Sequence, residues 1–600
     1  MNCGTHNNQN QISMKIFTSF FIILTLMCFC NPGYNQSNKN SHKTTLANKA
    51  ITTNKALDSK LDSIFSSFNK NTPGIAVTVI QNGKVLAKKA YGMASLEFSV
   101  PFTHNTLVRI PYSEGREFIS IAAALMEKDG LLHFTDKVRK YFPNLPQWSD
   151  AVTIQDLLNH SSGFDDEWAT LALTQASMAN RLDKSQFLQF LYNQPTPSVE
   201  PGKGYMYSNS DFGLLRLILE KTYGEDLAAY MKRKFFDPLK MYATRIHNDK
   251  EAVIANRANS YIIDGSSYKL WQDKTSPGGN YFVLTSANDL EKWAAAHADP
   301  KSFVSAAVDR LKQNARPIPV MPGTNYVFGQ KLRNIGNYEA VVHMGVSKLP
   351  YISYVPKQNL TVILFSNSLI QRWNLMEQAL SSALHLKIPV VVKRDLPQQP
   401  IDVNPEELKS FAGTYKWNVT PTFQSYMPRK RFTEFISENG VLKVLYNRQD
   451  TVDLVPVAKN TFKDIESPDF FAFSQTHSDS AMKVMYTYES DTIWMEKFLA
   501  TKPNLGRQQL QNFTGKYYSR HLDFYLTLVL NEKDKLVVKR PTIADKIIEP
   551  SADGEFELVM EYGTDISEGW IRFHYDDNGN VSHFTISNPR LMGHRFDKVQ

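Results

Sequence analysis

The 600-residue chain is too long for one ordinary domain, and its 42% hydrophobic and 21% charged residues exclude an intrinsically disordered protein. The formal net charge is +8, but Lys and Arg alternate with Asp and Glu and form no long basic run, so nucleic-acid binding is not expected. All three cysteines (Cys3, Cys28 and Cys30) precede the globular part, which excludes a disulfide framework, a cysteine nucleophile and thiolate metal sites there.

The chain begins with a hydrophobic segment that predicts export. Shortly after Met14 the sequence runs IFTSFFIILTLMCFC and then breaks at NPGYNQSNKN. This run has the length of a signal-peptide core and falls short of the roughly 20 apolar residues that cross a bilayer. We therefore expect residues 1–36 to be a leader and the protein to be periplasmic or secreted, with translation starting at Met1 or Met14. The alternative is a permanent membrane anchor, either the leader itself or a lipid on Cys28.

A mixture of helices and strands is predicted after a flexible spacer. Residues 37–54, rich in Asn, Ser, Thr and Lys, form this spacer. Two apolar runs within 73–92 flank Asn-Gly and predict a β-hairpin, while apolar residues recur at helical spacing over 118–128 and 211–231. Short strands are predicted at 326–333, 338–344, 351–356 and 360–367. We expect one domain at 55–390 that combines helices with an antiparallel sheet.

The C-terminal part contains an internal repeat. A stretch rich in Pro, Gln and charged residues predicts a linker at 391–404. After it, LKSFAGTY at 408–415 recurs as LQNFTGKY at 510–517, and later Leu, Pro and Phe positions repeat with the same spacing. We expect two homologous all-β modules, barrel-like and similar to lipocalins, at 405–505 and 506–600, with the aromatic residues of the motif in their cores.

Six segments between residues 57 and 385 match one enzyme family in their order along the chain. They are YGMASLEFSVPFTHNTLVRI (91–110), MEKDGLLHFTDKVRKYFPNLP (126–146), VTIQDLLNHSSGF (152–164), PGKGYMYSNSDFGLL (201–215), GGNYFVLTSANDLEKW (278–293) and VVHMGVS (341–347). Together they resemble the serine β-lactamase-related family, which includes class C β-lactamases, D-aminopeptidases and penicillin-binding-protein-like esterases. The resemblance implies an α+β domain of the β-lactamase/transpeptidase type, with an antiparallel sheet flanked by helices and an all-helical region, followed here by the two barrels.

The resemblance also implies an acyl-enzyme mechanism, in which a serine attacks a carbonyl group. Ser113 matches the nucleophile at a helix N-terminus. Tyr207 and Asn209 match the Tyr-x-Asn element, whose tyrosine can accept the serine proton and whose asparagine positions the substrate. His343 and Gly345 match the third element, Lys/His-x-Gly, on a strand that lines the site.

The family pattern further implies an oxyanion hole and a substrate class. The hole would use the backbone N–H groups of Ser113 and Val346, each contributing about 3 kcal/mol to transition-state stabilisation. The substrate would be a small molecule or peptide with an amide or ester bond, such as a peptide, a D-amino-acid derivative or a β-lactam. No metal or organic cofactor is expected, because the sequence has no HExxH, P-loop or dinucleotide fingerprint. The oligomeric state stays open.

One catalytic position departs from the family. Where the family has Ser-x-x-Lys, this chain reads Ser113-Glu114-Gly115-Arg116. Lysine can lose its proton and act as a base, whereas arginine, with a pKa above about 12, stays charged. Arg116 can still favour a phenolate at Tyr207, but the loss of a general base costs roughly 10²–10⁴ in rate.

The register at the serine has one rival. An extra residue precedes Ser113, and the rival alignment puts Tyr112 and Gly115 at the two catalytic places. That alignment also moves the extra residue into the following helix, where insertions are tolerated less well than in a loop. We therefore prefer Ser113, and in neither register does a lysine follow.

These residues support two main hypotheses. The first is an exported serine hydrolase, and the second is a catalytically impaired relative that binds peptide or cell-wall ligands in the same cleft. Antibiotic resistance is a weaker third hypothesis, because Arg116 makes rapid deacylation harder. Two further features are expected to be structural: His160 in NHSSG, and DDNGN at 576–580, which resembles part of a calcium loop but lies between strand-like sequences, as a hairpin turn does.

Overall fold

The structure is a computed structural model. It describes residues 54–110, 115–174, 182–247, 252–264, 267–271, 282–321, 324–335, 337–344, 351–368, 373–386, 403–417, 432–447, 450–464, 470–474, 482–488, 491–498, 503–540, 543–551, 554–562, 565–588 and 590–599. The predicted leader, nearly all of the spacer and nearly all of the linker lie outside these ranges. Within them, none of the helices combines the length and apolarity needed to cross a membrane.

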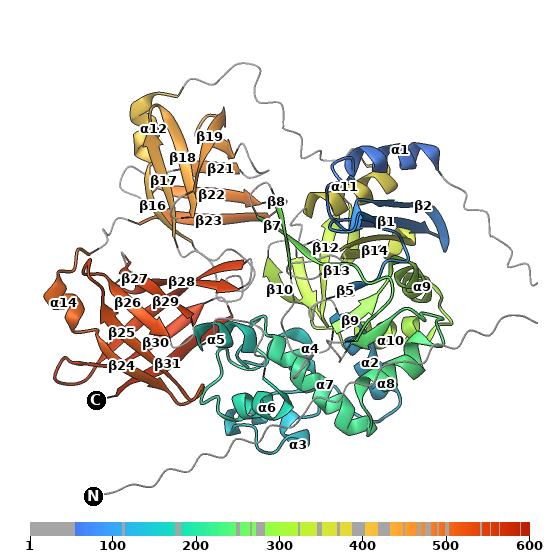
Figure 1. Cartoon of the computed structure of the whole chain (residues 1–600), viewed down its shortest axis with the longest axis horizontal. Coiled ribbons are helices and arrows are strands. Elements are labelled where there is room, and N and C mark those ends of the chain that lie inside the picture. The colour runs from blue at the N-terminus through green and yellow to red at the C-terminus, as the bar shows by residue number, and fades with distance from the viewer. Residues whose placement is uncertain are drawn as a thin grey trace, which may run out of the picture. The chain divides into compact units, whose positions relative to one another are not determined.

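An eight-stranded antiparallel sheet forms the centre of the first domain, in the order β10-β11-β12-β13-β14-β15-β1-β2 (Figure 1). Its strands are β1 (Ile75–Gln81), β2 (Lys84–Tyr91), β10 (Ile318–Met321), β11 (Thr324–Val327), β12 (Gln330–Ile335), β13 (Tyr338–Met344), β14 (Tyr351–Val355) and β15 (Leu360–Ser366). The hairpin predicted at 73–92 is confirmed, because β1 pairs with β2. Asn82 and Gly83 turn the chain with φ of 51° and 70°, the left-handed conformation that an Asn-Gly turn requires.

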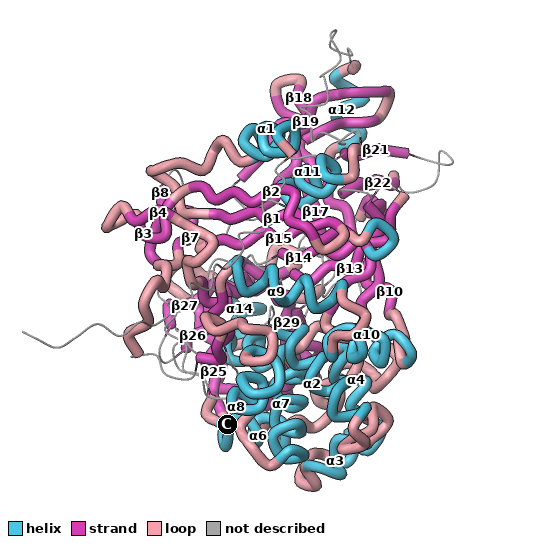
Figure 2. The backbone as a smooth tube through the Cα atoms, turned by 90° about the vertical axis from the view of Figure 1, so that its right-hand side faces the viewer, coloured by secondary structure: helices cyan, strands magenta, loops and turns pink. Residues whose placement is uncertain are grey.

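Helices cover both faces of this sheet. Odd-numbered residues of β1 share a core with α1 (Lys55–Ile64) and α11 (Trp373–Ala383). Its even-numbered apolar residues lie in the core that contains α2 (Arg116–Lys128) and α9 (Ala287–Ala298), since successive side chains of a strand point to opposite faces. Figure 2 shows α1 and α11 on one side of the strands and α9 on the other. Helix α2, which begins at a predicted site residue, is therefore packed into the core on one face of the sheet.

The predicted helices are present, but one of them is divided. The helix predicted over 118–128 is confirmed as α2. The helical segment predicted over 211–231 forms two helices, because Gly224, with a φ of +81°, ends α7 (Asn209–Tyr223) and α8 (Leu227–Met231) follows. The other helices of this domain are α3 (Val138–Tyr141), α4 (Ile154–Asn159), α5 (Glu167–Thr174), α6 (Lys184–Tyr192) and α10 (Phe303–Gln313). Its short strands are β3 (Met93–Ser95), β4 (Val100–Pro101), β5 (Val108–Ile110), β6 (Arg245–His247), β7 (Tyr261–Asp264), β8 (Ser267–Leu270) and β9 (Phe282–Thr285).

The strand predictions near the end of the domain are also mostly confirmed. Strands β13, β14 and β15 lie where 338–344, 351–356 and 360–367 were predicted. The strand predicted over 326–333 is instead the β11–β12 hairpin, because Phe328 and Gly329 turn the chain with φ of 48° and 86°. This turn packs against α2, as described below.

Each repeat of the C-terminal part forms a closed eight-stranded antiparallel barrel (Figure 1). The first barrel consists of β16 (Gly413–Trp417), β17 (Phe432–Glu438), β18 (Val441–Asn447), β19 (Asp450–Ala458), β20 (Thr461–Asp464), β21 (Phe470–Ser474), β22 (Lys483–Tyr488) and β23 (Asp491–Lys497). The second consists of β24 (Gly515–Ser519), β25 (Phe524–Leu530), β26 (Leu536–Arg540), β27 (Ile543–Pro550), β28 (Phe556–Tyr562), β29 (Asp565–Tyr575), β30 (Val581–Asn588) and β31 (Leu591–Val599). A short helix precedes each, α12 (Pro405–Phe411) and α14 (Arg507–Gln511). The predicted pair of all-β barrel modules is confirmed.

The repeated sequence motif makes the same contacts in both barrels. The hydroxyl of Tyr415 donates to the carbonyl of Phe411, and that of Tyr517 donates to the carbonyl of Phe513, both at 2.9 Å. All four aromatic side chains are buried, which confirms their prediction as core residues. Matching sequence and matching contacts support a common origin for the two modules.

The DDNGN segment is a hairpin turn, as predicted. It joins β29 to β30. The Asp576 carboxylate accepts the backbone N–H groups of Asn578 and Asn580 at 3.0 and 2.8 Å. This carboxylate therefore shapes the turn through local hydrogen bonds, as Asp does in tight turns.

Candidate active site

The structure describes some of the predicted site residues and not others. Those outside the described ranges are Ser113, Gly345 and Val346. Those within them are Arg116, Tyr207, Asn209 and His343. Ser113 belongs to the connection between β5, which is held by its pairing with β9, and α2, which begins at Arg116. Ser113 thus precedes the first residue of α2 by three positions in the sequence.

Tyr207 and Asn209 form a hydrogen-bonded pair at the start of α7. The Tyr207 hydroxyl donates to Asn209 Oδ1 at 3.0 Å. The Asp166 carboxylate accepts both the backbone N–H and the side-chain amide N–H of Asn209, at 3.1 and 3.0 Å. Because Asp166 accepts from the amide nitrogen, the amide oxygen must face Tyr207. Asp166 therefore fixes the orientation of Asn209, which in turn positions the phenol.

Arg116 lies beside this tyrosine, as the resemblance implies. Its guanidinium carbon is 4.8 Å from the centroid of the Tyr207 ring and 5.7 Å from that of Phe212. One guanidinium nitrogen, Nη1, donates to His160 Nε2 at 2.9 Å. Arg116 is only 3% exposed, so it is not a surface residue.

His160 and Asp211 extend this contact into a buried chain. His160 Nδ1 lies 3.0 Å from Asp211 Oδ2, and the Ser162 hydroxyl also donates to the Asp211 carboxylate. Arginine can only donate, so His160 Nε2 must accept and Nδ1 must carry the proton. Burial, with the positive charges of Arg116 and Arg590, holds the pKa of His160 well below its ordinary value. The imidazole is neutral, and its lone pair is occupied by Arg116.

Burial has the opposite effect on the acid of this chain. It raises the pKa of Asp211 well above the ordinary range, and the neighbouring acids Asp156 and Asp166 raise it further. Sequence analysis predicted a structural role for His160 and did not single out Asp211. Arg116 could have indicated such partners, because a buried guanidinium needs hydrogen-bond acceptors. The sequence alone does not identify the residues that act as these acceptors.

His343 is connected to α2 through Glu117. The His343 Nδ1 atom lies 3.7 Å from one carboxylate oxygen of Glu117, and His297 Nε2 lies 2.7 Å from the other. Burial alone would raise the pKa of Glu117, but the two histidines together lower it below its usual value. The strand that carries the His-x-Gly element is thereby linked to the residue next to Arg116.

The second barrel also contributes to the site, which sequence analysis did not predict. Arg590, in the turn between β30 and β31, has its guanidinium carbon 4.8 Å from the centroid of the Tyr207 ring. Its carbonyl accepts the backbone N–H of Asp166 at 3.4 Å. Nearby, Ala169 and Leu173 of α5 join the hydrophobic core of this barrel. Two guanidinium groups from different parts of the chain thus lie beside one buried tyrosine.

Comparisons with known proteins agree with this geometry. The family model described as Beta-lactamase matches residues 61–384. Protein flp of Staphylococcus aureus is 24% identical over 311 residues, covering 49% of this chain and 59% of that protein. Penicillin-binding protein 4* of Bacillus subtilis is 30% identical over 191 residues, covering 31% of this chain and 42% of that protein. This chain therefore spans less than two thirds of either relative.

A solved structure shows the fold over a larger part of the chain. The octameric penicillin-binding protein homologue from Pyrococcus abyssi superposes with a TM-score of 0.51 at 20% identity, over 74% of this chain and 99% of that one. The family model and the shared fold agree with each other. Because the matched residues make up more than half of its length, the protein belongs to the beta-lactamase family.

Proposed function

We propose that the protein is a serine hydrolase that cleaves an amide or ester bond in a small molecule or peptide, such as a D-amino-acid derivative. Ser113 would attack the carbonyl and form an acyl-enzyme, which water then hydrolyses. Asn209 and His343 would bind substrate near Gly345, and the N–H groups of Ser113 and Val346 would hold the oxyanion.

The observation that carries this proposal is the environment of Tyr207. Arg116 cannot accept a proton, and the His160 lone pair is occupied by Arg116. Among the described groups around Arg116, Tyr207 is therefore the best candidate base. Asn209 Oδ1 orients the neutral phenol through a hydrogen bond that is lost on ionisation, and the guanidinium groups of Arg116 and Arg590 lie close enough to stabilise the phenolate that results. Tyr207 as phenolate would take the Ser113 proton and later return it to the leaving group.

One observation favours the second candidate, a catalytically impaired relative that binds peptides or cell-wall ligands. Arg116 is held in a buried chain with His160 and Asp211. A group fixed in this way carries charge but moves no proton, in contrast to the lysine of the family pattern. Binding without turnover is the outcome if Tyr207 never reaches the phenolate state.

Covalent labelling separates the two functions. We expect a fluorophosphonate or a fluorescent penicillin to label the wild-type chain and not Ser113→Ala. Tyr207→Phe is expected to lower the labelling rate about 10²–10⁴-fold, the usual worth of a general base. The matched control is Tyr205→Phe, which removes a hydroxyl from the same buried aromatic cluster. An unlabelled wild type together with a labelled Arg116→Lys variant would favour the binding protein.

The proposal includes export to the periplasm or the medium. Its support is the apolar run after Met14, which has the length of a signal-peptide core. Cell fractionation with an antibody against the barrels tests this step. Detection only in the cytoplasm would contradict export, while detection only in the membrane fraction would favour an anchor.

A further inference from the structure

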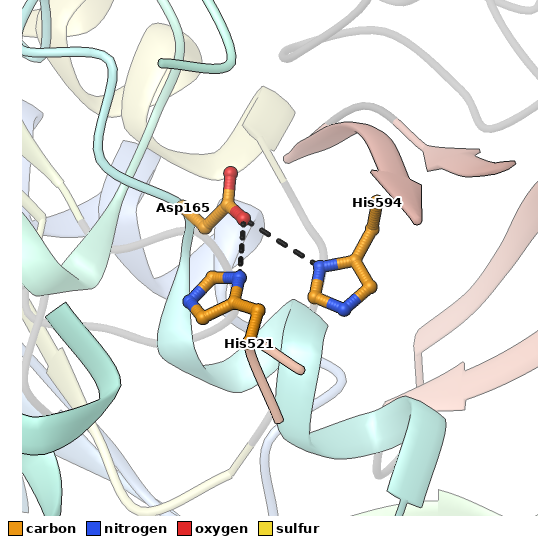
Figure 3. Close-up of side chains that lie close together, drawn as sticks. All are labelled: Asp165, His521 and His594. Atoms are coloured by element: carbon orange, nitrogen blue, oxygen red, sulfur yellow. Dashed lines mark ion pairs between the residues drawn. The ribbon is translucent and has the colours of Figure 1, made fainter. Parts of the chain in front are cut away.

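Three side chains that the mechanism does not use converge where the second barrel contacts the first domain (Figure 3). Asp165 precedes the residue that orients Asn209, His521 lies between β24 and β25, and His594 lies on β31. Each is at least nine-tenths buried, with exposures of 4%, 6% and 5%. One ligand atom from each residue lies within 4.8 Å of the other two.

The spacing of these atoms is that of a ligand set. Asp165 Oδ2 is 3.6 Å from His521 Nδ1 and 3.7 Å from His594 Nδ1. These distances are too long for direct hydrogen bonds. Ligand atoms bonded to tetrahedral zinc at 2.0–2.2 Å lie about 3.4 Å apart. The two distances from Asp165 are therefore within about 0.3 Å of zinc geometry, and the third, between the two histidine nitrogens, is at most 4.8 Å.

In each of the three residues, the side-chain polar atom that is not a proposed ligand already makes a hydrogen bond. This leaves the proposed ligand atoms facing one another. His521 Nε2 lies 3.0 Å from the carbonyl of Phe190 and donates to it, so the neutral ring presents a lone pair at Nδ1. A hydrogen bond from the ring nitrogen that does not bind the ion orients the histidines of metal sites in this way.

The same arrangement holds for the other two residues. His594 Nε2 lies 2.8 Å from the Ser519 hydroxyl, and when it donates there, its Nδ1 is left with a lone pair. The Ser198 hydroxyl donates to Asp165 Oδ1, which leaves Oδ2 facing the two imidazoles. Two imidazoles and one carboxylate form a donor set that zinc accepts, with a fourth position for water.

We propose that Asp165, His521 and His594 bind one zinc ion that fastens the second barrel to the Tyr207 segment. The Asp165 carbonyl accepts the hydroxyls of Ser208 and Ser210, on both sides of Asn209, at 3.2 and 2.7 Å. An ion held by Asp165 and two barrel histidines therefore connects β31 to the start of α7. It also fixes the barrel turn that brings Arg590 to Tyr207.

The test measures metal binding by the full-length chain. The protein is stripped with EDTA, reconstituted with Zn²⁺ or Co²⁺, desalted and analysed for bound metal. We expect one ion per chain and, for Co²⁺, the intense visible absorption of a four-coordinate site with nitrogen ligands. Asp165→Asn and His594→Gln are each expected to weaken metal binding by at least about 100-fold. Replacing a residue that only hydrogen-bonds to a metal ligand already lowers metal affinity by about 10–100-fold.

The matched control is the other histidine pair of the same barrel. The rings of His574 and His583 stack with centroids 4.3 Å apart on its outer side, and the double variant His574→Gln/His583→Gln should still bind one ion. If one of the ligand variants fails to fold, thermal unfolding replaces it: zinc should raise the Tm of the wild type and of this control above that in EDTA. Less than about a tenth of an ion per chain, or binding lost only in the control, overturns the proposal. Neither readout depends on hydrolase activity.

Discussion

The arginine at position 116 changes what its neighbours must do. A lysine ammonium can donate or lose a proton, whereas a guanidinium is a permanent charge with donors in a fixed plane. Burying that charge requires acceptors, and His160 together with Asp211 supplies them. Arg116 is therefore accompanied by two further buried residues, His160 and Asp211, which continue its hydrogen bond into a chain.

Removing the histidine of this chain should destabilise the first domain. In His160→Ala, Arg116 and Asp211 lose their shared partner while they stay buried, and breaking such a network costs about 3–5 kcal/mol. Urea unfolding followed by tryptophan fluorescence measures the loss. The control is His133→Ala, which removes an exposed histidine of the same domain and should change stability by less than about 0.5 kcal/mol. Equal effects of the two substitutions would contradict the buried network.

The same histidine predicts how stability depends on pH. The pKa of His160 is lowered in the folded state, so below the ordinary histidine pKa of about 6.5 the unfolded chain binds a proton that the folded chain does not. His160 by itself therefore lowers stability as the pH drops below about 6.5, by up to about 1.4 kcal/mol per pH unit. His104, whose pKa is lowered to about 4 by burial and Lys88, adds to the same trend. Asp211, whose pKa is raised, contributes a slope of the opposite sign, so the contribution of the histidine is measured as the difference between the wild type and a His160 variant.

Urea midpoints at about pH 7 and about pH 5.5 measure this slope. His160→Gln should lose the contribution of the histidine, because its side chain does not titrate, so lowering the pH should destabilise the variant less than it destabilises the wild type. Equal changes in stability in the two proteins would show that the imidazole is not held neutral by its surroundings.

At the scale of elements, the turn between β11 and β12 packs against the site. Gly329 has a φ of +86°, and a Cβ added there would lie 3.3 Å from Arg116 Cβ, Phe212 Cζ and Ser120 Oγ. Ser120, on α2, also donates to the Phe328 carbonyl at 2.8 Å. The β11–β12 turn therefore packs against the helix that carries Arg116.

Gly329→Ala should combine backbone strain with a clash at this contact. We expect a loss of about 2–4 kcal/mol in stability and slower labelling of Ser113, because Arg116 must move. Gly83→Ala is the control, since Gly83 also has a positive φ of +70° but has no other atom within 4 Å of the added Cβ. It should cost only about 1–2 kcal/mol and leave labelling unchanged. Equal losses in both variants would mean that the turn does not support the site.

These two turns also show what a sequence can predict at this scale. Asn82-Gly83 carries the residue types of a tight hairpin turn, and that hairpin was predicted correctly. Phe328-Gly329 begins with an aromatic residue that rarely adopts a positive φ, so the segment was predicted as one strand. Gly224 interrupts a continuous apolar pattern, and periodicity alone does not distinguish a break from a tolerated glycine.

At the scale of the whole molecule, the second barrel contributes a residue to the candidate site, because Arg590 lies beside Tyr207. Sequence analysis predicted the first domain and the two barrels, because family motifs and an internal repeat lie along the chain. It could not predict that Arg590 meets Tyr207. Such a contact depends on how two folded surfaces fit together, and residues hundreds of positions apart leave no local pattern. The expectation that no metal binds rested on short sequence motifs such as HExxH. Asp165, His521 and His594 are far apart in the sequence and form no such motif, so their proximity could not be predicted in this way.

Arg590→Ala tests this contribution of the barrel. Loss of one of the two guanidinium groups should slow labelling of Ser113 about 5- to 30-fold, because each group is expected to stabilise the phenolate by about 1–2 kcal/mol. Arg595→Ala is the control, because Arg595 lies on the same hairpin but pairs with Asp597 at the surface. If Arg590→Ala labels as fast as Arg595→Ala, the barrel does not act on Tyr207.

The most direct test of the account is to locate the adduct that a fluorophosphonate leaves on the wild-type chain. The reagent is added to the full-length protein, the adduct is counted by intact-mass spectrometry, and proteolysis identifies the modified residue. We predict one adduct per chain, on Ser113, that is absent from Ser113→Ala and slow to form in Tyr207→Phe. An unmodified chain, or an adduct on Tyr112 or elsewhere, would contradict the assignment of this protein as a hydrolase that uses Ser113.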